Sequence, residues 1–246
     1  MARGEFTHAV AGEPSIVATI GLHGSASTWV YNIVRELLVA DHGVEAMKAC
    51  YADRMDDLPS DFGAAMRVVI KSHHGSPEFD AFLRAHSATM IVSLRDPRDA
   101  ALSMTQRFRA PLQHTVQWVL RDCRHMAAVL DEAELVLKYE DRFFDQHAVV
   151  DKIAHSLGST ADIDKKSQIF ESYRTEAVRA FAAGIFNLPT ERVDQTEASR
   201  YDRLTQIHNI HVGDAQSGKW RHLPRETQDK MTEVFSPYLR RFGYMS

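Results

Sequence analysis

The apolar positions in the first half of the chain alternate between two periods. Residues 15–20 form a short apolar, β-branched run that ends at Gly21, which is typical of a buried strand. From 30 to 38 the apolar residues recur every three or four positions, which predicts an amphipathic helix. Two further strands are predicted at 66–70 and 89–94, with a short helix between them. Strands that alternate with helices indicate a parallel sheet covered on both faces.

The second half of the chain is predicted to be mainly helical. The elements expected there are helices at 97–109, 112–130, 147–157 and 163–184, a strand at 134–139, an irregular stretch from 185 to 224 and a last helix that ends near residue 237. Residues 1–14 are expected to be a loose leader, and 15–246 a single domain. The fold class is therefore α/β in three layers, with a central parallel sheet of about four or five strands and a mobile helical lid at the C-terminal end.

Composition and charge narrow the kinds of ligand. Of the 246 residues, 44% are apolar and 25% are charged, and 29 Lys and Arg against 33 Asp and Glu leave a net charge of −4. This is not the positive field of a nucleic-acid or anionic-membrane binder, so any anion must be held by a local site. The two cysteines, the lack of a secretory signal and the lack of a run of ~18 apolar residues predict a cytoplasmic protein without stable membrane insertion.

A loop of small residues and hydroxyls joins the first strand to the first helix. It reads GLHGSASTW from Gly21 to Trp29. Small side chains let an anion approach the backbone, and the N–H groups and dipole of a helix N-terminus favour it there. The loop thus predicts a phosphate or sulfate cradle, although a tight turn capped by Ser27 or Thr28 explains it equally well. It is not a Walker A loop, because no lysine precedes the two hydroxyl residues.

A second candidate anion site follows the strand at 89–94. Asp96 can cap a helix that opens with Pro97, which leaves Arg95 at the tip of the strand and Ser103 about two turns into the helix. An anion could be held between the guanidinium and the hydroxyl. Ligands of open α/β sheets bind at this end of the strands. The alternative is an ion pair between Arg95 and a nearby carboxylate.

Together these segments resemble the sulfotransferases that use 3′-phosphoadenosine 5′-phosphosulfate (PAPS). The first loop of that family, P-K-S-G-T-T-W, aligns with residues 23–29, and its 3′-phosphate motif, an Arg with a Ser eight residues on, matches Arg95 and Ser103. The resemblance spans residues 16–221. It implies a P-loop-like sulfotransferase fold and binding of PAPS and of its product, adenosine 3′,5′-bisphosphate (PAP).

Three further matches occur in the same order as in the family. Lys71-Ser72-His73 is similar to its K-T-H, in which the His is the general base. Residues 137–141 (LKYED) are similar to its Y-E-D strand end, and 218–221 (GKWR) to its C-terminal G-D-W-K. The resemblance implies that His73 takes the acceptor proton while Lys71, two residues earlier on an extended strand end, stabilises the transferring group.

Two departures from the family pattern are clear. Gly24 stands where the family has a Lys or Arg beside the sulfonate, so Lys71, His23 and Lys219 become the candidates for that charge. The basic R-K-G triplet that closes over the 3′-phosphate is replaced by HVGDAQS at 211–217. The residues expected to bind the nucleotide are Gly24, Ser25, Ala26, Ser27, Thr28, Trp29, Arg95, Ser103, Tyr139, Ser217, Gly218, Lys219, Trp220 and Arg221.

The predicted function is transfer of a sulfonate from PAPS to a hydroxyl or similar acceptor of a small molecule, lipid or natural product, without metal and without a nucleic-acid partner. A homodimer is left open. The acceptor pocket is expected to draw on 53–62, 74–79, the start of the helix at 112 and 185–211. The alternatives are a nucleotide kinase on the same kind of sheet and a non-catalytic module that binds the 3′-phosphoadenosine nucleotide.

One further pattern in the sequence could mark a metal site. His208, His211 and Asp214 are spaced H-x-x-H-x-x-D, and such side chains are common metal ligands. A helical face that would bring the three together is not evident, and sulfonate transfer needs no metal. We therefore predict no metal here.

Overall fold

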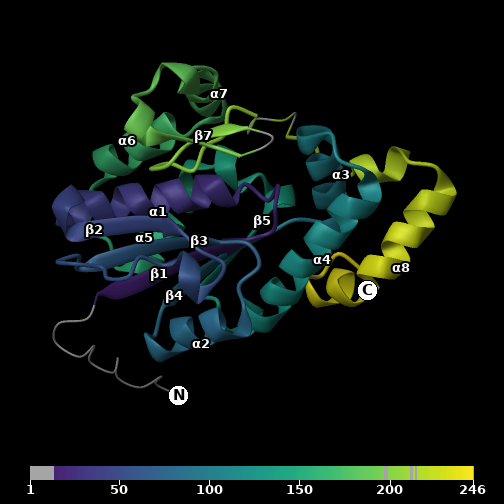
Figure 1. Cartoon of the computed structure of the whole chain (residues 1–246), viewed down its shortest axis with the longest axis horizontal. Helices are drawn as coiled ribbons and strands as arrows, with labels where there is room; N and C mark the ends of the chain where they lie inside the picture. Colours follow the sequence, from purple (N-terminus) through teal and green to yellow (C-terminus); the bar gives the residue numbers. More distant parts are fainter. Residues whose placement is uncertain (1–13, 197–198, 211–212, 214, 246) are drawn as a thin grey trace.

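A parallel sheet of five strands runs through the molecule in the order β2-β3-β1-β4-β5 (Figure 1). A computed structural model of the chain describes residues 14–196, 199–210, 213 and 215–245. The strands are β1 (Ser15–Gly21), β2 (Met47–Tyr51), β3 (Arg67–Ser72), β4 (Thr89–Leu94) and β5 (Leu135–Lys138). All neighbouring pairs in this sheet are parallel. The predicted α/β class and parallel sheet are confirmed.

Helices cover both faces of the sheet (Figure 1). One face carries α1 (Ser27–His42), α5 (His147–Leu157), α6 (Ile163–Ser172) and α7 (Thr175–Ala183). The other carries α2 (Pro77–Ala85), α3 (Pro97–Phe108), α4 (Leu112–Val129) and α8 (Arg225–Arg241). Successive strand residues join opposite apolar clusters, as Val17 does on one face and Ile16 and Ala18 on the other. Because both faces of the sheet are buried, the sequences of its central strands are continuous apolar runs rather than alternating ones.

The remaining elements are short. An antiparallel pair, β6 (Val193–Gln195) and β7 (Arg200–Asp202), lies in the stretch that was predicted to be irregular. Single 3₁₀ turns occur at Val44–Ala46, Met55–Asp57, Leu130–Glu132, Tyr139–Asp141, Phe143–Asp145, Ile185–Asn187, Thr190–Arg192 and Lys219–His222. No helix in the described part of the chain is both long enough and apolar enough to cross a bilayer.

Three element predictions were wrong. β2 was missed because it is an edge strand with mostly half-buried side chains and no clear period. The helix predicted at 163–184 is two helices, because the backbone turns extended at Arg174 without a Gly or Pro to signal it. The last helix continues past Pro237 to Arg241, because Phe235 and Leu239 are both fully buried in the core on either side of the proline.

The carboxyl ends of the three central strands lie side by side. Ile20 of β1 pairs with Ser72 of β3, and Gly21 of β1 pairs with Ser93 of β4. The strand order reverses about β1, so the loops that follow these strands diverge to opposite sides and leave a crevice between them. The loop at 21–29 and the residues after β3 and β4 therefore meet at one edge of the sheet.

Candidate active site

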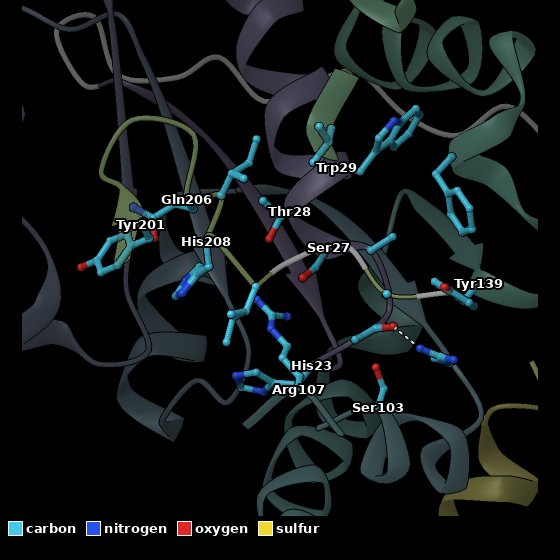
Figure 2. A pocket seen from close by; sticks show the side chains of 18 of the residues that line it. His23, Ser27, Thr28, Trp29, Ser103, Arg107, Tyr139, Tyr201, Gln206 and His208 are labelled. Atoms are coloured by element: carbon cyan, nitrogen blue, oxygen red, sulfur yellow. Dashed lines mark hydrogen bonds between the residues drawn. The ribbon is translucent and has the colours of Figure 1, made fainter. Parts of the chain in front are cut away.

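A cavity of about 1190 Å³ occupies this edge of the sheet. Its floor is formed by the loop after β1 and by residues at the ends of β3 and β4, and residues of 173–178 and 196–219 line it as well. Figure 2 shows Tyr201, Gln206 and His208 on one side of the cavity, Ser103 and Tyr139 on the other, and His23, Ser27 and Arg107 between them.

Most of the predicted site residues line this cavity. They are His23, Gly24, Ala26, Ser27, Thr28, Trp29, Lys71, His73, Arg95, Ser103, Tyr139 and Lys219. Ser25 instead lies buried beneath the loop, where its hydroxyl donates to the Leu22 carbonyl at 2.7 Å and contacts Ser93 Oγ at 2.9 Å. Ser217, Gly218, Trp220 and Arg221 are outside the cavity wall.

The loop after β1 comes close to helix α3 at Gly24. Gly24 has φ +77°, and a Cβ built on it would lie 3.3 Å from Ser103 Oγ. Helix α1 begins at Ser27 with Ala26 as its N-cap residue, and no side chain caps it. The alternative in which Ser27 or Thr28 caps a simple turn therefore does not hold, and both residues line the cavity instead.

Arg95 lies at the tip of β4, beside this loop. Its Nη1 donates to the Gly24 carbonyl at 2.8 Å, its Nη2 donates to the Gln216 carbonyl at 2.7 Å, and its guanidinium lies 4.0 Å from the Tyr139 ring centroid. No carboxylate among the described residues forms an ion pair with it. The alternative of a simple ion pair therefore fails, because Asp96 pairs with Arg98 instead.

The donors around this loop suit an anion. A guanidinium has five N–H donors, and the two bonds above leave Arg95 with three, including a buried Nε without a partner. The indole N–H of Trp29 is also buried without a partner. An anion beside Gly24 would meet the Ser103 hydroxyl and the Arg95 guanidinium, because both lie close to where a Cβ would otherwise stand.

His73 and Lys71 lie together at the end of β3. The Nδ1–H of His73 donates to the Gly21 carbonyl at 2.5 Å, since a carbonyl can only accept, so Nε2 carries the lone pair and faces Lys71 Nζ at 2.8 Å. Burial lowers the pKa of His73 well below its ordinary value and lowers the pKa of Lys71 to about 7. The imidazole is therefore neutral near pH 7 and able to accept a proton.

Asp53 holds this strand end in place, whereas the sequence predicted it only as part of the acceptor segment 53–62. Its Oδ1 accepts from the Ser72 hydroxyl and from the backbone N–H groups of His73 and His74 at 2.7–3.0 Å, and its Oδ2 accepts from the Tyr51 hydroxyl. Burial alone would raise the pKa of Asp53, but these hydrogen bonds lower it to about 2. The carboxylate thus fixes the backbone that carries His73.

A buried carboxylate from α4 reaches the loop as well. Asp122 Oδ2 accepts from the backbone N–H of His23 at 2.9 Å and lies 2.7 Å from its Nδ1. The rings of His23 and His73 stack with centroids 3.8 Å apart. Ligand atoms of His23, His73 and Asp122 lie within 4.8 Å of one another. Stacked rings direct their nitrogens side by side rather than toward one ion, and both nitrogens of His73 already have partners in Gly21 and Lys71. This geometry does not favour a metal, and its absence remains a prediction.

No protein-family model matches the sequence, and no curated protein resembles it closely enough in sequence to register as a relative. Solved structures do resemble it. A mouse sulfotransferase, SULT7A1, in complex with PAP is similar with a TM-score of 0.61 at 13% identity, covering 92% of this chain and 84% of that one. The chain has the sulfotransferase fold.

Two structures of retinol dehydratase support the same assignment. One is a complex with retinol and PAP, with a TM-score of 0.60, 13% identity and coverage of 92% of this chain and 81% of that one. The other is a complex with androsterone and inactive cofactor PAP, with a TM-score of 0.58, 13% identity and coverage of 91% and 80%. At this identity the likeness is one of fold.

The cover of the cavity differs from the expected C-terminal helical lid. Within this sulfotransferase fold α8 packs on the same face as α3 and α4, with Phe235 and Leu239 fully buried, so it belongs to the core. The segment before it reaches the cavity instead. There Asp99 accepts from the backbone N–H groups of Gly218 and Trp220, which fastens the turn at Lys219–His222 to α3.

The end of the cavity away from Arg95 is mainly aromatic. Tyr201 stacks on His208 with ring centroids 4.8 Å apart, and Tyr173 and Ile207 also line the cavity. Of the four segments expected to form an acceptor pocket, only 185–211 contributes described residues to the lining. His211 and Asp214 lie outside the described residues, so the H-x-x-H-x-x-D pattern has no structural test here.

Arg107 and Asp122 are the site residues that the sequence did not reveal. Arg107 lines the cavity four residues after Ser103, so the helical period of 97–109 was a usable signal. Asp122 sits on the apolar face of α4 next to Cys123 and is 1% exposed. A lone acid on an apolar helix face signals a buried partner, because an unpaired buried charge is costly.

Proposed function

We propose that this protein is a PAPS-dependent sulfotransferase that transfers a sulfonate to a hydroxyl or similar group of a small molecule, lipid or natural product. The observation that carries the proposal is the meeting of two groups in one cavity. Arg95 and Ser103 lie at Gly24 in the loop after β1, and His73 with Lys71 lies at the end of the neighbouring strand. The first pair suits a 3′-phosphate and the second suits the transfer step.

In this reaction the bond between sulfur and the bridging oxygen of PAPS breaks, and its electron pair stays on the 5′-phosphate of PAP. A new bond forms between sulfur and the acceptor oxygen, whose proton goes to His73 Nε2. The Gly21 carbonyl holds the imidazole in the tautomer that leaves Nε2 free of hydrogen. The nearby Lys71 Nζ can turn from Nε2 to the developing negative charge.

The aromatic end of the cavity supports an acceptor with an apolar or aromatic body. Tyr201, Tyr173 and Ile207 offer ring faces and an apolar edge, while the hydroxyl to be sulfated would point toward His73. Retinol and androsterone, bound in the two retinol dehydratase structures, are ligands of that protein and have bodies of this kind. A cytoplasmic location stays a prediction.

The kinase alternative is less well supported, since no lysine precedes Ser27 and Thr28 and none of the described cavity residues is an Asp or Glu that could hold Mg²⁺. The alternative of a module that binds the nucleotide without catalysis can be excluded only by measuring turnover. His73, with a lone pair directed at Lys71, is a group that mere nucleotide binding would not require.

Thermal unfolding with PAP or with ATP, each in EDTA and then in Mg²⁺, tests the ligand. A ligand at a hundred times its Kd adds ~2.7 kcal/mol, which raises the melting temperature by several degrees. We expect a shift with PAP that is independent of metal. A shift only with ATP and Mg²⁺ would replace the proposal by a kinase. Transfer of ³⁵S from labelled PAPS to a panel of phenols, sterols and primary alcohols then separates an enzyme from a binding module.

A further inference from the structure

The transferring sulfonate needs a positive charge that the loop after β1 does not provide. Negative charge builds on the oxygens around sulfur, and a preorganised cation there is the usual way to stabilise it. Gly24 has no side chain to offer. Lys71 Nζ faces His73 Nε2 at 2.8 Å, His23 Nδ1 faces Asp122, and Lys219 Nζ donates to Gln106 Oε1 at 2.9 Å. His23 and Lys219 are engaged elsewhere, and Lys71 can reach the sulfonate only by leaving His73.

Arg107 is a fourth cation in the same cavity. It lies on α3 one helical turn after Ser103, and residues four apart share a helix face. Ser103 Oγ faces Gly24, so the face that carries Arg107 is turned toward the cavity. Both Arg107 and His23 line the cavity, and in the view of Figure 2 Arg107 lies between Ser103 on one side and His208 on the other. It therefore stands at the junction of the two ends, where the sulfonate would pass.

Arg107 has no anionic partner in the described part of the chain. It forms no ion pair there, and its Nε is buried without a hydrogen-bond partner. Burial lowers its pKa to about 10, so the guanidinium is still charged at pH 7. None of the described residues lining the cavity is an Asp or Glu. Arg107 is half-buried, and an unpaired charge that is shielded from water is costly and normally marks the place of an opposite charge.

The surroundings of Arg107 show which part of the cavity lacks an anion. Burial, together with the charges of Arg107, Lys71 and His23, lowers the pKa of His208 to about 3. Burial likewise lowers the pKa of Lys71, and the charge of Arg107 adds to that effect. These side chains thus act on one another, and all four line the same cavity. An anion placed in that space would relieve the repulsion among them.

We propose that Arg107 binds the sulfonate of the donor and carries the positive charge that Gly24 leaves missing. This inference rests on the proposed function. Two N–H groups of the guanidinium would donate to sulfonate oxygens before transfer and keep those bonds as the sulfur moves to the acceptor oxygen. Arg107 itself is chemically unchanged. The proton leaves to His73, and the bridging oxygen leaves with PAP.

The test compares binding of PAPS and PAP, which differ only by the sulfonate. Dissociation constants for both would be measured without acceptor, by calorimetry and by melting shift, in the wild type, Arg107→Met and Arg107→Lys. We expect Arg107→Met to weaken binding of PAPS by about tenfold or more, which is about 1.4 kcal/mol, and binding of PAP by less than threefold. Arg107→Lys should recover part of the difference. Turnover with PAPS should fall in the same order.

The matched control is Arg121→Met, which removes the same charge from an exposed position on α4 outside the cavity wall and should change neither constant by more than twofold. Equal weakening of PAPS and PAP, or a change only in the acceptor KM, would overturn the assignment. If Arg107→Met does not fold, the same comparison with Arg107→Lys and Arg107→Gln decides it. A wild type that binds neither nucleotide would instead refute the proposed function.

Discussion

At the scale of single residues, Arg95 joins three parts of the cavity. Its guanidinium donates to the carbonyls of Gly24 and Gln216 and lies over the ring of Tyr139. The three remaining N–H donors are those that the proposed 3′-phosphate would use. The specificity for a 3′-phosphorylated nucleotide is therefore expected to depend mainly on Arg95, with Ser103 beside it.

We predict that Arg95→Ala weakens PAP by ~1.5–3 kcal/mol, as for the loss of one charge-assisted contact. Adenosine 5′-phosphate, which has no 3′-phosphate, should be affected much less. The dissociation constants of PAP and of adenosine 5′-phosphate would both be measured by calorimetry on the same variant. The second nucleotide is the control, because it lacks the 3′-phosphate. Equal losses for both nucleotides would mean that Arg95 holds the loop rather than the phosphate.

His73 should separate turnover from binding. We predict that His73→Ala lowers kcat by about 10²–10⁴-fold, the usual range for a lost general base, while the Kd of PAP stays within a fewfold of the wild type. The measurement is single-turnover transfer from labelled PAPS. His114→Ala, at an exposed position on α4, is the control. A variant that keeps most of its kcat would exclude His73 as the base.

At the scale of elements, the contact between α3 and the turn at Lys219–His222 decides how the cavity is covered. Asp99 is 1% exposed and accepts from the N–H groups of Gly218 and Trp220. Arg98 stacks on the Trp220 ring at 3.5 Å on the same side. These contacts hold in place the stretch of backbone that offers the Gln216 carbonyl to Arg95.

We predict that Asp99→Ala destabilises the protein by about 1–3 kcal/mol, because it leaves two backbone donors without their acceptor. Amide hydrogen exchange at Gly218 and Trp220 should become faster than in the wild type, and PAP should bind more weakly. Asp131→Ala, which removes only the exposed ion pair with Arg241, should cost about 1 kcal/mol or less. Unchanged exchange at 218 and 220 would contradict this account of the cover.

At the scale of the whole molecule, the buried Lys71 links stability to pH. Burial lowers its pKa to about 7 from an ordinary value of 10.5. Between those values the unfolded chain binds a proton that the folded chain does not, so this group makes the free energy of unfolding rise with pH. Its contribution is present above pH 10.5 and is lost as the pH falls to about 7.

We predict that Lys71→Met is more stable than the wild type near pH 7 and that its advantage shrinks by pH 9. The comparison removes the effect of all other titrating groups, because both proteins carry them. Urea unfolding at several pH values between 7 and 9 measures the difference, and Lys48→Met, at an exposed lysine of β2, is the control. A difference that does not vary with pH would show that Lys71 keeps an ordinary pKa.

Much of the fold could be predicted because the signals are local. β1, β4, α3 and α5 begin and end within a residue or two of the sequence prediction, since apolar periods and capping residues such as Asp96 act over a few positions. The break between α6 and α7 and the edge strand β2 could not be predicted, because neither has a Gly, a Pro or a clear period. At the break between α6 and α7, Tyr173 accepts a hydrogen bond from Arg35 of α1, which is a contact between residues distant in the sequence.

Apart from β2 and the break between α6 and α7, the sequence by itself determined the order of the main strands and helices. It also placed His23, Lys71, His73 and Arg95 at or just after strand ends, because parallel strands direct their carboxyl ends to one edge. Only the tertiary structure decided which distant side chains complete that edge. Asp122 lies 99 residues from His23 and Asp53 lies 20 from His73, and both contacts depend on how the layers pack rather than on any local pattern. The unpaired charge of Arg107 became visible only once every described neighbour around it was known.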